Sequence, residues 1–292
     1  MKTSHSLVLA VAFWAATPLA AAPADEADGS GQVVVVKRDY KDEDVRFGSK
    51  TVDFFMIRKA VEDALAGHPA GASARLTLQP MRFVSPEMDH SVEHAGMLVG
   101  PASVVALDGN GQPDGMERVY ARGLLVGTTP WKHGKKNGEE IIYENGRIKA
   151  TIPWVDGKMQ GILKTFHPDG TLMAETNYIA GEAAGLSRST DEQGRVVQEA
   201  TLKHGKRDGI AKDFWPETGK LRREIPYEMG RVEGVAKEFY PSGILKRELP
   251  FKNNAMNGME IDYDDGGKVS QRQYWLDGDP VTQAEFEKKA AK

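Results

Sequence analysis

Residues 138–155 alternate apolar and polar positions in two short runs, and this alternation favours β-strands over helices. The apolar positions are Ile141 and Tyr143 in the first run, and Ile148, Ala150, Ile152 and Trp154 in the second. Successive side chains of a strand point to opposite faces, so the second set is expected to share one face. Asn145-Gly146 between the runs provides the positive φ angles of a tight turn. The pattern predicts a β-hairpin.

The hairpin pattern recurs, and we number its copies as units 1 to 7. Each unit begins at one glycine: Gly115, Gly138, Gly161, Gly185, Gly209, Gly234 and Gly258. An earlier glycine precedes each of these, except where Asn254 replaces it: Gly111, Gly134, Gly157, Gly181, Gly205 and Gly230. A third column follows the unit glycine and is aromatic except in unit 4: Tyr120, Tyr143, Phe166, Thr190, Phe214, Phe239 and Tyr263. A repeat of this kind is typical of an elongated array.

The second strand of each unit has two columns of its own. The first is Leu125, Ile148, Leu172, Val196, Leu221, Leu245 and Val269, and the second is Trp131, Trp154, Tyr178, Leu202, Tyr227, Phe251 and Trp275. Both columns have the same spacings, so the insertions fall in turns and the strand register is preserved.

The glycine pairs are predicted to be structural connectors between hairpins, at backbone positions that a side chain would obstruct. A phosphate-binding loop would add Lys-Ser/Thr after its last glycine and would occur once. Here the spacing recurs, and residues such as Glu139 and Ile162 follow the glycine.

These motifs, as in Gly134 to Trp154 and Gly205 to Tyr227, resemble the MORN-repeat variant of bacterial proteins often named YwqK-like antitoxins. The resemblance covers residues 111 to about 280. It implies an elongated antiparallel sheet of successive hairpins that serves as a protein- or lipid-interaction surface, and the antitoxin name implies a neutralised partner. Export of this chain fits poorly with a cytoplasmic toxin. Unit 4 lacks both aromatics, at Thr190 and Leu202, and is expected to be the weakest point of the array.

Outside the repeats, residues 1–24 have the lysine, apolar run and small residues of a secretory signal peptide, with cleavage expected near Ala22 or Ala24. The run is too short for a membrane anchor. Residues 25–32 are a polar linker, and residues 33–107 are expected to form a small α+β domain. Its expected strands are Val33–Val36, Leu76–Phe83 and Ser103–Leu107, and its helix is marked by Phe54, Ile57, Val61 and Leu65.

Residues 108–280 then hold the hairpins, and residues 281–292 a capping helix that opens with the capping box Thr282-Gln283-Ala284-Glu285. The fold class is therefore mainly β: an elongated antiparallel sheet of seven tandem hairpins of about 24 residues, preceded by the α+β domain.

Composition restricts the chemistry. The 292 residues include no cysteine, which excludes disulfides and thiolate zinc sites. The formal net charge is −4 and the two signs are mixed along the repeats, so we expect no nucleic-acid partner and no membrane contact. The signal peptide predicts a periplasmic or secreted protein.

Two motifs suggest metal chemistry. His90-Ser91-Val92-Glu93-His94 matches the HxxEH pattern of zinc peptidases but lacks an assignable third ligand, and Gly96 would end its helix. Residues 108–115 resemble a calcium loop, yet Pro113 occupies the glycine position and Val119 the place of the glutamate. The first motif is interpreted as a polar turn of helix and the second as a connector, so no metal site and no cofactor are predicted.

No catalytic grouping stands out, so the leading expectation is a non-enzymatic binding or scaffold protein with an unidentified protein partner. The alternatives are an antitoxin or immunity-like protein and, last, a zinc peptidase using the HxxEH stretch. Candidate binding residues are the aromatics of the second-strand column, for which burial is the competing interpretation: Trp131, Trp154, Tyr178, Tyr227, Phe251 and Trp275. The oligomeric state stays open, because an exposed hairpin edge can pair with another copy.

Overall fold

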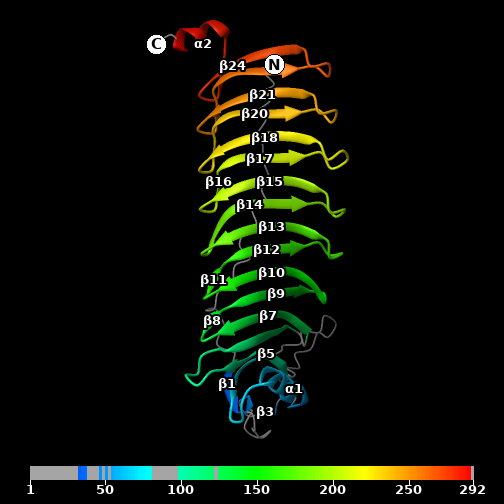
Figure 1. Cartoon of the computed structure of the whole chain (residues 1–292), viewed down its shortest axis with the longest axis vertical. Coiled ribbons are helices and arrows are strands. Elements are labelled where there is room, and N and C mark those ends of the chain that lie inside the picture. Colours follow the sequence, from blue (N-terminus) through cyan, green and yellow to red (C-terminus); the bar gives the residue numbers. More distant parts are fainter. Residues whose placement is uncertain are drawn as a thin grey trace, which may run out of the picture.

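The computed structural model describes residues 32–37, 46–47, 50–51, 54–80, 98–121 and 124–290. Within them, one antiparallel sheet of 23 strands runs along the longest axis of the molecule, with helix α1 (Phe54–Ala64) near one end and helix α2 (Gln283–Ala290) at the other (Figure 1). The predicted signal peptide and the HxxEH stretch lie outside the described residues. No helix of the described part is long and apolar enough to cross a membrane.

Seven hairpins form most of this sheet, as the repeat predicts. Their strand pairs are β6 (Gly115–Ala121) and β7 (Leu124–Lys132), β9 (Gly138–Glu144) and β10 (Arg147–Val155), β12 (Gly161–Phe166) and β13 (Leu172–Ile179), β14 (Glu182–Thr190) and β15 (Val196–Lys203), β17 (Gly209–Phe214) and β18 (Leu221–Glu228), β20 (Gly234–Phe239) and β21 (Leu245–Lys252), and β23 (Gly258–Tyr263) and β24 (Val269–Leu276). Each hairpin pairs with its successor in the sequence. The predicted fold class is confirmed.

The register of each hairpin places its unit glycine opposite the residue of the second column in the second strand. Gly138 faces Trp154, and Gly258 faces Trp275. Near the turn, the register shifts between Ile148 and Ala150, so Ile148 faces Tyr143 while Ala150 faces Ile142. Residues directly opposed on neighbouring strands share a face of the sheet, and at a bulge two residues of one strand lie opposite one residue of the other. Since Tyr143 and Ile142 are adjacent in β9, they point to opposite faces. The expectation that Ile148 shares a face with Ala150 and Trp154 is therefore wrong.

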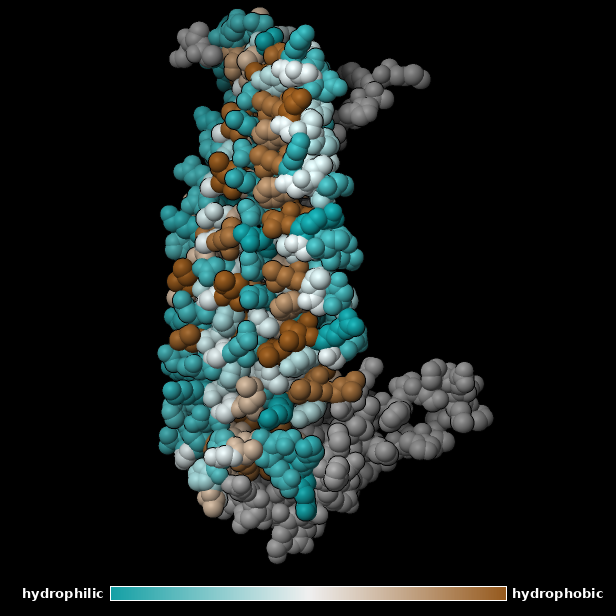
Figure 2. All heavy atoms as spheres, turned by 45° about the vertical axis from the view of Figure 1, so that its right-hand side comes forward, coloured by the Kyte–Doolittle hydropathy of each residue, from teal (hydrophilic) through white to brown (hydrophobic). Residues whose placement is uncertain are grey.

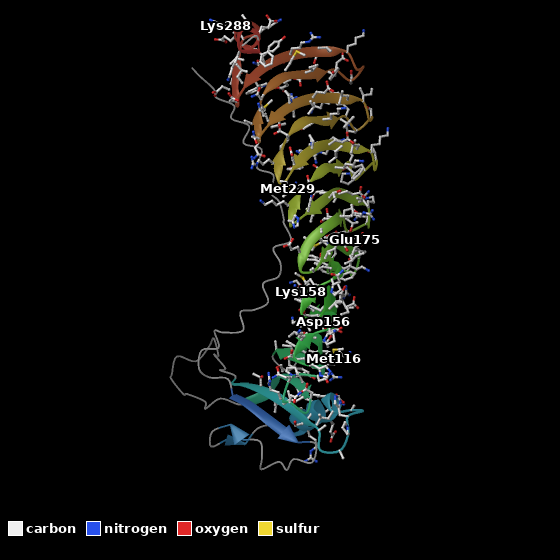
Figure 3. All side chains as sticks on the ribbon, turned by 60° about the vertical axis from the view of Figure 1, so that its left-hand side comes forward. Met116, Asp156, Lys158, Glu175, Met229 and Lys288 are labelled. Atoms are coloured by element: carbon white, nitrogen blue, oxygen red, sulfur yellow. The ribbon has the colours of Figure 1, made fainter. Side chains whose placement is uncertain are left out.

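Two-residue turns connect successive hairpins along one side of the sheet, at the ends of its strands. Both turn residues have positive φ, for example 48° and 80° at Asp156-Gly157 and 47° and 88° at Met229-Gly230. Positive φ at both positions is the signature of a type I′ turn. Figure 3 brings this side of the sheet forward and labels Asp156, Lys158 and Met229 on it. Short strands follow the turns: β8 (Lys135–Lys136), β11 (Lys158–Met159), β16 (Lys206–Arg207), β19 (Arg231–Val232) and β22 (Ala255–Met256).

These connectors also hydrogen-bond to one another from unit to unit. The amide of Gly157 donates to the carbonyl of Lys136 at 2.8 Å, and the amide of Gly205 donates to that of Ala183 at 2.8 Å. The glycine pairs thus serve as structural connectors, as predicted.

The segment before the hairpins extends the same sheet. Its strands β1 (Gln32–Lys37), β4 (Ser73–Pro80) and β5 (Leu98–Leu107) pair antiparallel in that order, and β5 pairs with β6. Two short strands, β2 (Arg46–Phe47) and β3 (Lys50–Thr51), form a separate pair. The three predicted strands and the helix are present, and residues 81–83 of the second predicted strand lie outside the described residues. The boundary of a separate domain stays a prediction.

Helix α1 supplies the one cluster of fully buried side chains found among the described residues. Val61 and Leu65 of the helix contact Leu76 of β4 and Val104 of β5, and each of these four is less than 2% exposed. Tyr120 of unit 1 packs against this cluster. The first hairpin is therefore anchored on a conventional core, whereas the later hairpins depend on their neighbours in the sheet.

At the C-terminal end, the predicted helix is present as α2, but the edge of the last hairpin is paired with a strand that was not predicted. Strand β25 (Asp279–Val281) pairs with β24, and Thr282 and Glu285 form the capping box of α2: the Thr282 amide donates to Glu285 Oε2 at 2.9 Å, and the Glu285 amide donates to Thr282 Oγ1 at 3.3 Å. The ring of Phe286 lies 5.3 Å from that of Tyr274. The helix thus packs on the last hairpin.

Candidate interaction surface

The sheet has two faces of different character, which follow from strand alternation and the observed register. We call the face that carries Trp131, Trp154 and Trp275 the tryptophan face. The opposite face carries the residue after each unit glycine and the charged residues described below, and we call it the ladder face. Because each glycine is opposed to the tryptophan column, the residue after the glycine points to the ladder face.

On the tryptophan face, each indole N–H donates to a glutamate of the same hairpin. Trp154 Nε1 lies 2.7 Å from Glu140 Oε2, and Trp275 Nε1 lies 2.7 Å from Glu260 Oε2. In unit 1, Trp131 Nε1 lies 2.8 Å from Glu117 Oε2. These glutamates lie two residues after the unit glycine, in the three units whose second strand has tryptophan in its second column. At the same position the other units have Leu163, Ser187, Ala211 and Ala236. A partly buried indole N–H needs an acceptor, which explains the pairing.

Glu140 shows how fully these carboxylates are used. Besides Trp154, it accepts hydrogen bonds from Thr129 Oγ1 at 3.2 Å and from Lys136 Nζ at 2.8 Å, and Lys136 lies 4.6 Å from the centre of the Trp154 ring. The structure therefore brings the predicted tryptophans into one column and satisfies their polar edges internally.

The remaining predicted aromatics lie in the same column. Tyr178 is buried, and the Tyr227 hydroxyl accepts a hydrogen bond from Arg207 Nη1 at 3.1 Å. Phe251 faces Gly234. Such packing supports burial as the role of these side chains, and a binding role for them stays a prediction.

The tryptophan face also holds ion pairs in the last units. Arg223 Nη2 lies 2.6 Å from Asp213 Oδ2, and Arg247 pairs with both Asp262 and Glu260, the latter at 3.2 Å. The hydrogen bond to Asp262 raises the pKa of the Arg247 guanidinium above its usual value, although burial opposes this shift. These charges are paired within the chain.

The ladder face has an outer row of exposed aliphatic side chains next to the connectors. The residue after the unit glycine is 36–53% exposed in six units: Met116, Ile162, Leu186, Ile210, Val235 and Met259. Glu139 takes this position in unit 2, so the fold does not require an apolar side chain there. Large side chains of this kind recur at one position of the repeat, with Asn177 and Thr201 between some of them, and this discontinuous apolar strip marks an interaction surface.

A row of alternating charges runs beside the aliphatic row. Consecutive members are opposed across neighbouring strands, from β12 to β21, in the order Lys164, Glu175, Arg188, Glu199, Lys212, Glu224, Lys237 and Glu248. Arg188 lies 3.0 Å from Glu199 and 3.6 Å from Glu175. Opposite charges on directly opposed positions stabilise a sheet modestly.

An inner row of aromatic and aliphatic side chains completes the ladder face near the turns. Each first-strand aromatic faces the apolar column of the second strand, as Phe166 faces Leu172 and Phe239 faces Leu245. Figure 2 shows hydrophobic side chains in columns along the sheet, with hydrophilic side chains between them. In unit 4, buried Thr190 replaces the aromatic and its hydroxyl donates to the carbonyl of Leu172.

The loop that resembles a calcium site is the connector from β5 to β6. Asp108 Oδ1 accepts the amides of Asn110 and Gln112, both at 2.9 Å, and Asp108 Oδ2 lies 3.2 Å from His133 Nδ1. These contacts, the Gln112 amide first, lower the pKa of Asp108. Asp108, Asp114 and His133 offer ligand atoms within 4.8 Å of one another, which is a geometry able to hold a metal ion. The hydrogen bonds account for the arrangement as a connector.

Sequence reasoning missed the ladder face. Its signal was present, because Lys164, Arg188, Lys212 and Lys237 each lie three residues after a unit glycine. Their glutamate neighbours come from the second strands, however, so the alternation becomes visible only with the register.

Comparison with known proteins supports the repeat type. The family described as MORN repeat variant matches residues 159–180 and 232–253, which contain the hairpins of units 3 and 6. No match was found among curated proteins. One similar solved structure is that of a mutant of S. aureus TarM in complex with Fondaparinux, alpha-GlcNAc-glycerol and UDP. It has 12% identity and a TM-score of 0.26, and the match covers 35% of this chain and 19% of TarM.

Proposed function

We propose that this chain is a non-enzymatic, exported repeat protein whose ladder face binds a protein partner. The observation that supports this proposal is the outer aliphatic row, which stays 36–53% exposed in six of the seven units although unit 2 folds with Glu139 in its place. Burying such side chains against a partner contributes roughly 25 cal/mol per Å² of apolar surface, so the strip provides a driving force for association.

Site-specific photo-cross-linking tests this proposal. A photoreactive residue at Val235 lies in the aliphatic row of unit 6, and the same residue at Val155 lies on the same face of unit 2 but two positions beyond that row, beside the connector; both valines are 47% exposed. The mature chain is expected to give a discrete cross-linked protein band from position 235 and none from position 155. Equal labelling from both positions, or no band, would count against a binding surface here.

Export is part of the same proposal. The first 24 residues support cleavage after Ala22 or Ala24, and N-terminal sequencing of protein recovered from the periplasm or medium is expected to begin at Pro23 or Asp25. Recovery of the uncleaved chain from the cytoplasm would contradict it.

A narrower form of the proposal, in which the partner is a toxin, is supported by the resemblance to YwqK-like antitoxins. The zinc-peptidase alternative depends on His90 and His94, and metal analysis of the mature protein with a His90→Ala control separates it from a binding role. Stoichiometric zinc and peptide hydrolysis, both lost in the variant, would overturn the non-enzymatic proposal.

A further inference from the structure

The charged row of the ladder face is self-complementary when its order is reversed. Eight charges alternate in sign from Lys164 to Glu248, and the midpoint of the row falls between Glu199 and Lys212, which are opposed across β15 and β17. Reversal about this midpoint exchanges every positive position with a negative one. A partner with charges of a single sign cannot place an opposite charge at every position of the row. A second copy of this chain in the reversed order places one at each position.

We propose that two copies of this chain associate through their ladder faces, about a two-fold axis that is parallel to the strands and passes between β15 and β17. This axis reverses the order of the strands in the second copy. Glu199 then faces Lys212 of the second copy, and Arg188 faces Glu224 of the second copy. A two-fold axis along the length of the sheet would instead place each charge on its own equivalent, so the charge pattern selects one arrangement.

The apolar rows fit the same operation. Leu186 faces Pro226 of the second copy, and Ile210 faces Thr201 of the second copy, so large side chains meet smaller ones. In the inner row, Val196 faces Phe214 of the second copy. Two sheets of identical twist pack face to face in this way in β-sandwiches, about 10 Å apart.

The contact is large enough for a stable dimer. Eight strands spaced about 4.8 Å apart, each contributing about six residues of about 3.3 Å, give a footprint of roughly 750 Å² per copy. A standard-size protein interface buries about 800 Å² per partner. Apolar side chains flank the charges on both sides, so the charges set the register while the apolar rows supply the driving force.

Charge reversal with rescue tests the arrangement by sedimentation equilibrium of the mature chain. Wild type is expected to dimerise, and Lys212→Glu and Glu199→Lys are each expected to weaken self-association at least about tenfold, because each places like charges together at two symmetric positions. An equimolar mixture of the two variants restores both opposite-charge pairs and is expected to dimerise. Thermal unfolding checks that each variant folds.

A monomeric wild type, or a mixture that fails to regain the dimer, would overturn the proposal. If a charge-reversed variant fails to fold, Val235→Lys replaces it, with Val155→Lys as the control of equal exposure. Val235→Lys is expected to weaken the dimer and Val155→Lys to leave it unchanged. The same dissociation constant of the dimer for both variants would overturn the proposal.

The inference rests on the proposed function, since it names the partner of the same face. The two fail differently. A monomer that still gives a cross-linked partner from position 235 contradicts the dimer alone, whereas a monomer that gives none contradicts both.

Discussion

At the residue scale, the unit glycine allows neighbouring hairpins to approach closely in units 2 and 7. Gly258 has a φ of +132°, and a Cβ placed on it would lie 2.9 Å from both Cβ and Cγ of Pro250. Gly138 stands in the same relation to Pro130, with a closest distance of 2.9 Å. The proline fits at the end of a strand, where its missing N–H does least harm, and the glycine leaves room for its ring.

Replacement of this glycine should therefore be costly. Gly258→Ala is expected to lower the free energy of unfolding by about 2 kcal/mol or more, because it combines a positive φ with a contact below van der Waals distance. Gly109→Ala is the control, since a Cβ there meets nothing within 4 Å and its φ lies outside the positive region. Chemical denaturation measures both variants. Equal stability of the two would show that the close approach is not required.

The turn residue before each connector glycine is a second determinant. Met229 has a φ of 47° and is 42% exposed, so it occupies a left-handed conformation without burying its side chain. Asn-Gly is the preferred sequence for a type I′ turn. Met229→Asn is therefore expected to raise the midpoint of thermal unfolding, by an amount equivalent to about 0.5–1 kcal/mol. A lower midpoint would indicate that Met229 makes a contact that outweighs its backbone strain.

At the element scale, aspartates fix the hairpin turns through their ionised carboxylates. Asp169 Oδ1 accepts the amide of Thr171 at 2.8 Å and its hydroxyl at 2.7 Å, and these bonds, the amide first, lower the pKa of Asp169 below the usual 3.8. Because the folded chain has the lower pKa, the carboxylate stabilises it above the unfolded pKa, and this contribution disappears as pH falls through the folded pKa.

Asp169→Asn keeps an acceptor oxygen but cannot titrate. The variant is expected to lose less stability than wild type between about pH 5 and pH 3, as measured by urea denaturation at each pH. Parallel curves for the two proteins would contradict a stabilising ionised Asp169.

Unit 4 is the element expected to open first. It replaces the aromatics of both columns with Thr190 and Leu202, and it substitutes hydrogen bonds for ring packing: Thr176 Oγ1 and Ser187 Oγ lie 2.9 Å apart, and Thr190 bonds to the Leu172 carbonyl. A neutral hydrogen bond contributes about 1 kcal/mol, less than burial of an aromatic ring. Hydrogen exchange should therefore be faster in residues 186–202 than in residues 139–154. Equal protection would refute this.

Most of the elements could be predicted because several independent sequence signals for them recur in each unit. Period-two alternation, turn residues and constant column spacing together identify strands, turns and register. The bulge could not be predicted, because Lys149 carries no residue signature for it, and the alternation rule alone places Ile148 on the wrong face. The tryptophan column was recognisable as a column, but its glutamate acceptors lie on the other strand and required the register to be paired with it.

At the scale of the whole molecule, the sheet is a nearly one-dimensional array. Each hairpin pairs with its immediate neighbours, α1 packs over one end and α2 over the other (Figure 1). In such an array stability is approximately a sum of unit and nearest-neighbour terms. The long sheet leaves two broad faces, and the proposed binding role depends on the continuity of the ladder face across successive units.

That continuity is best tested by backbone NOEs in a deuterated sample of the mature chain. The structure predicts contacts between successive hairpins around Thr151–Lys164, Glu199–Lys212 and Glu224–Lys237. Observation of all three would establish the stacking order on which the charged row depends. Helical amide contacts within these segments, or NOEs that join hairpins which are not successive, would contradict the account.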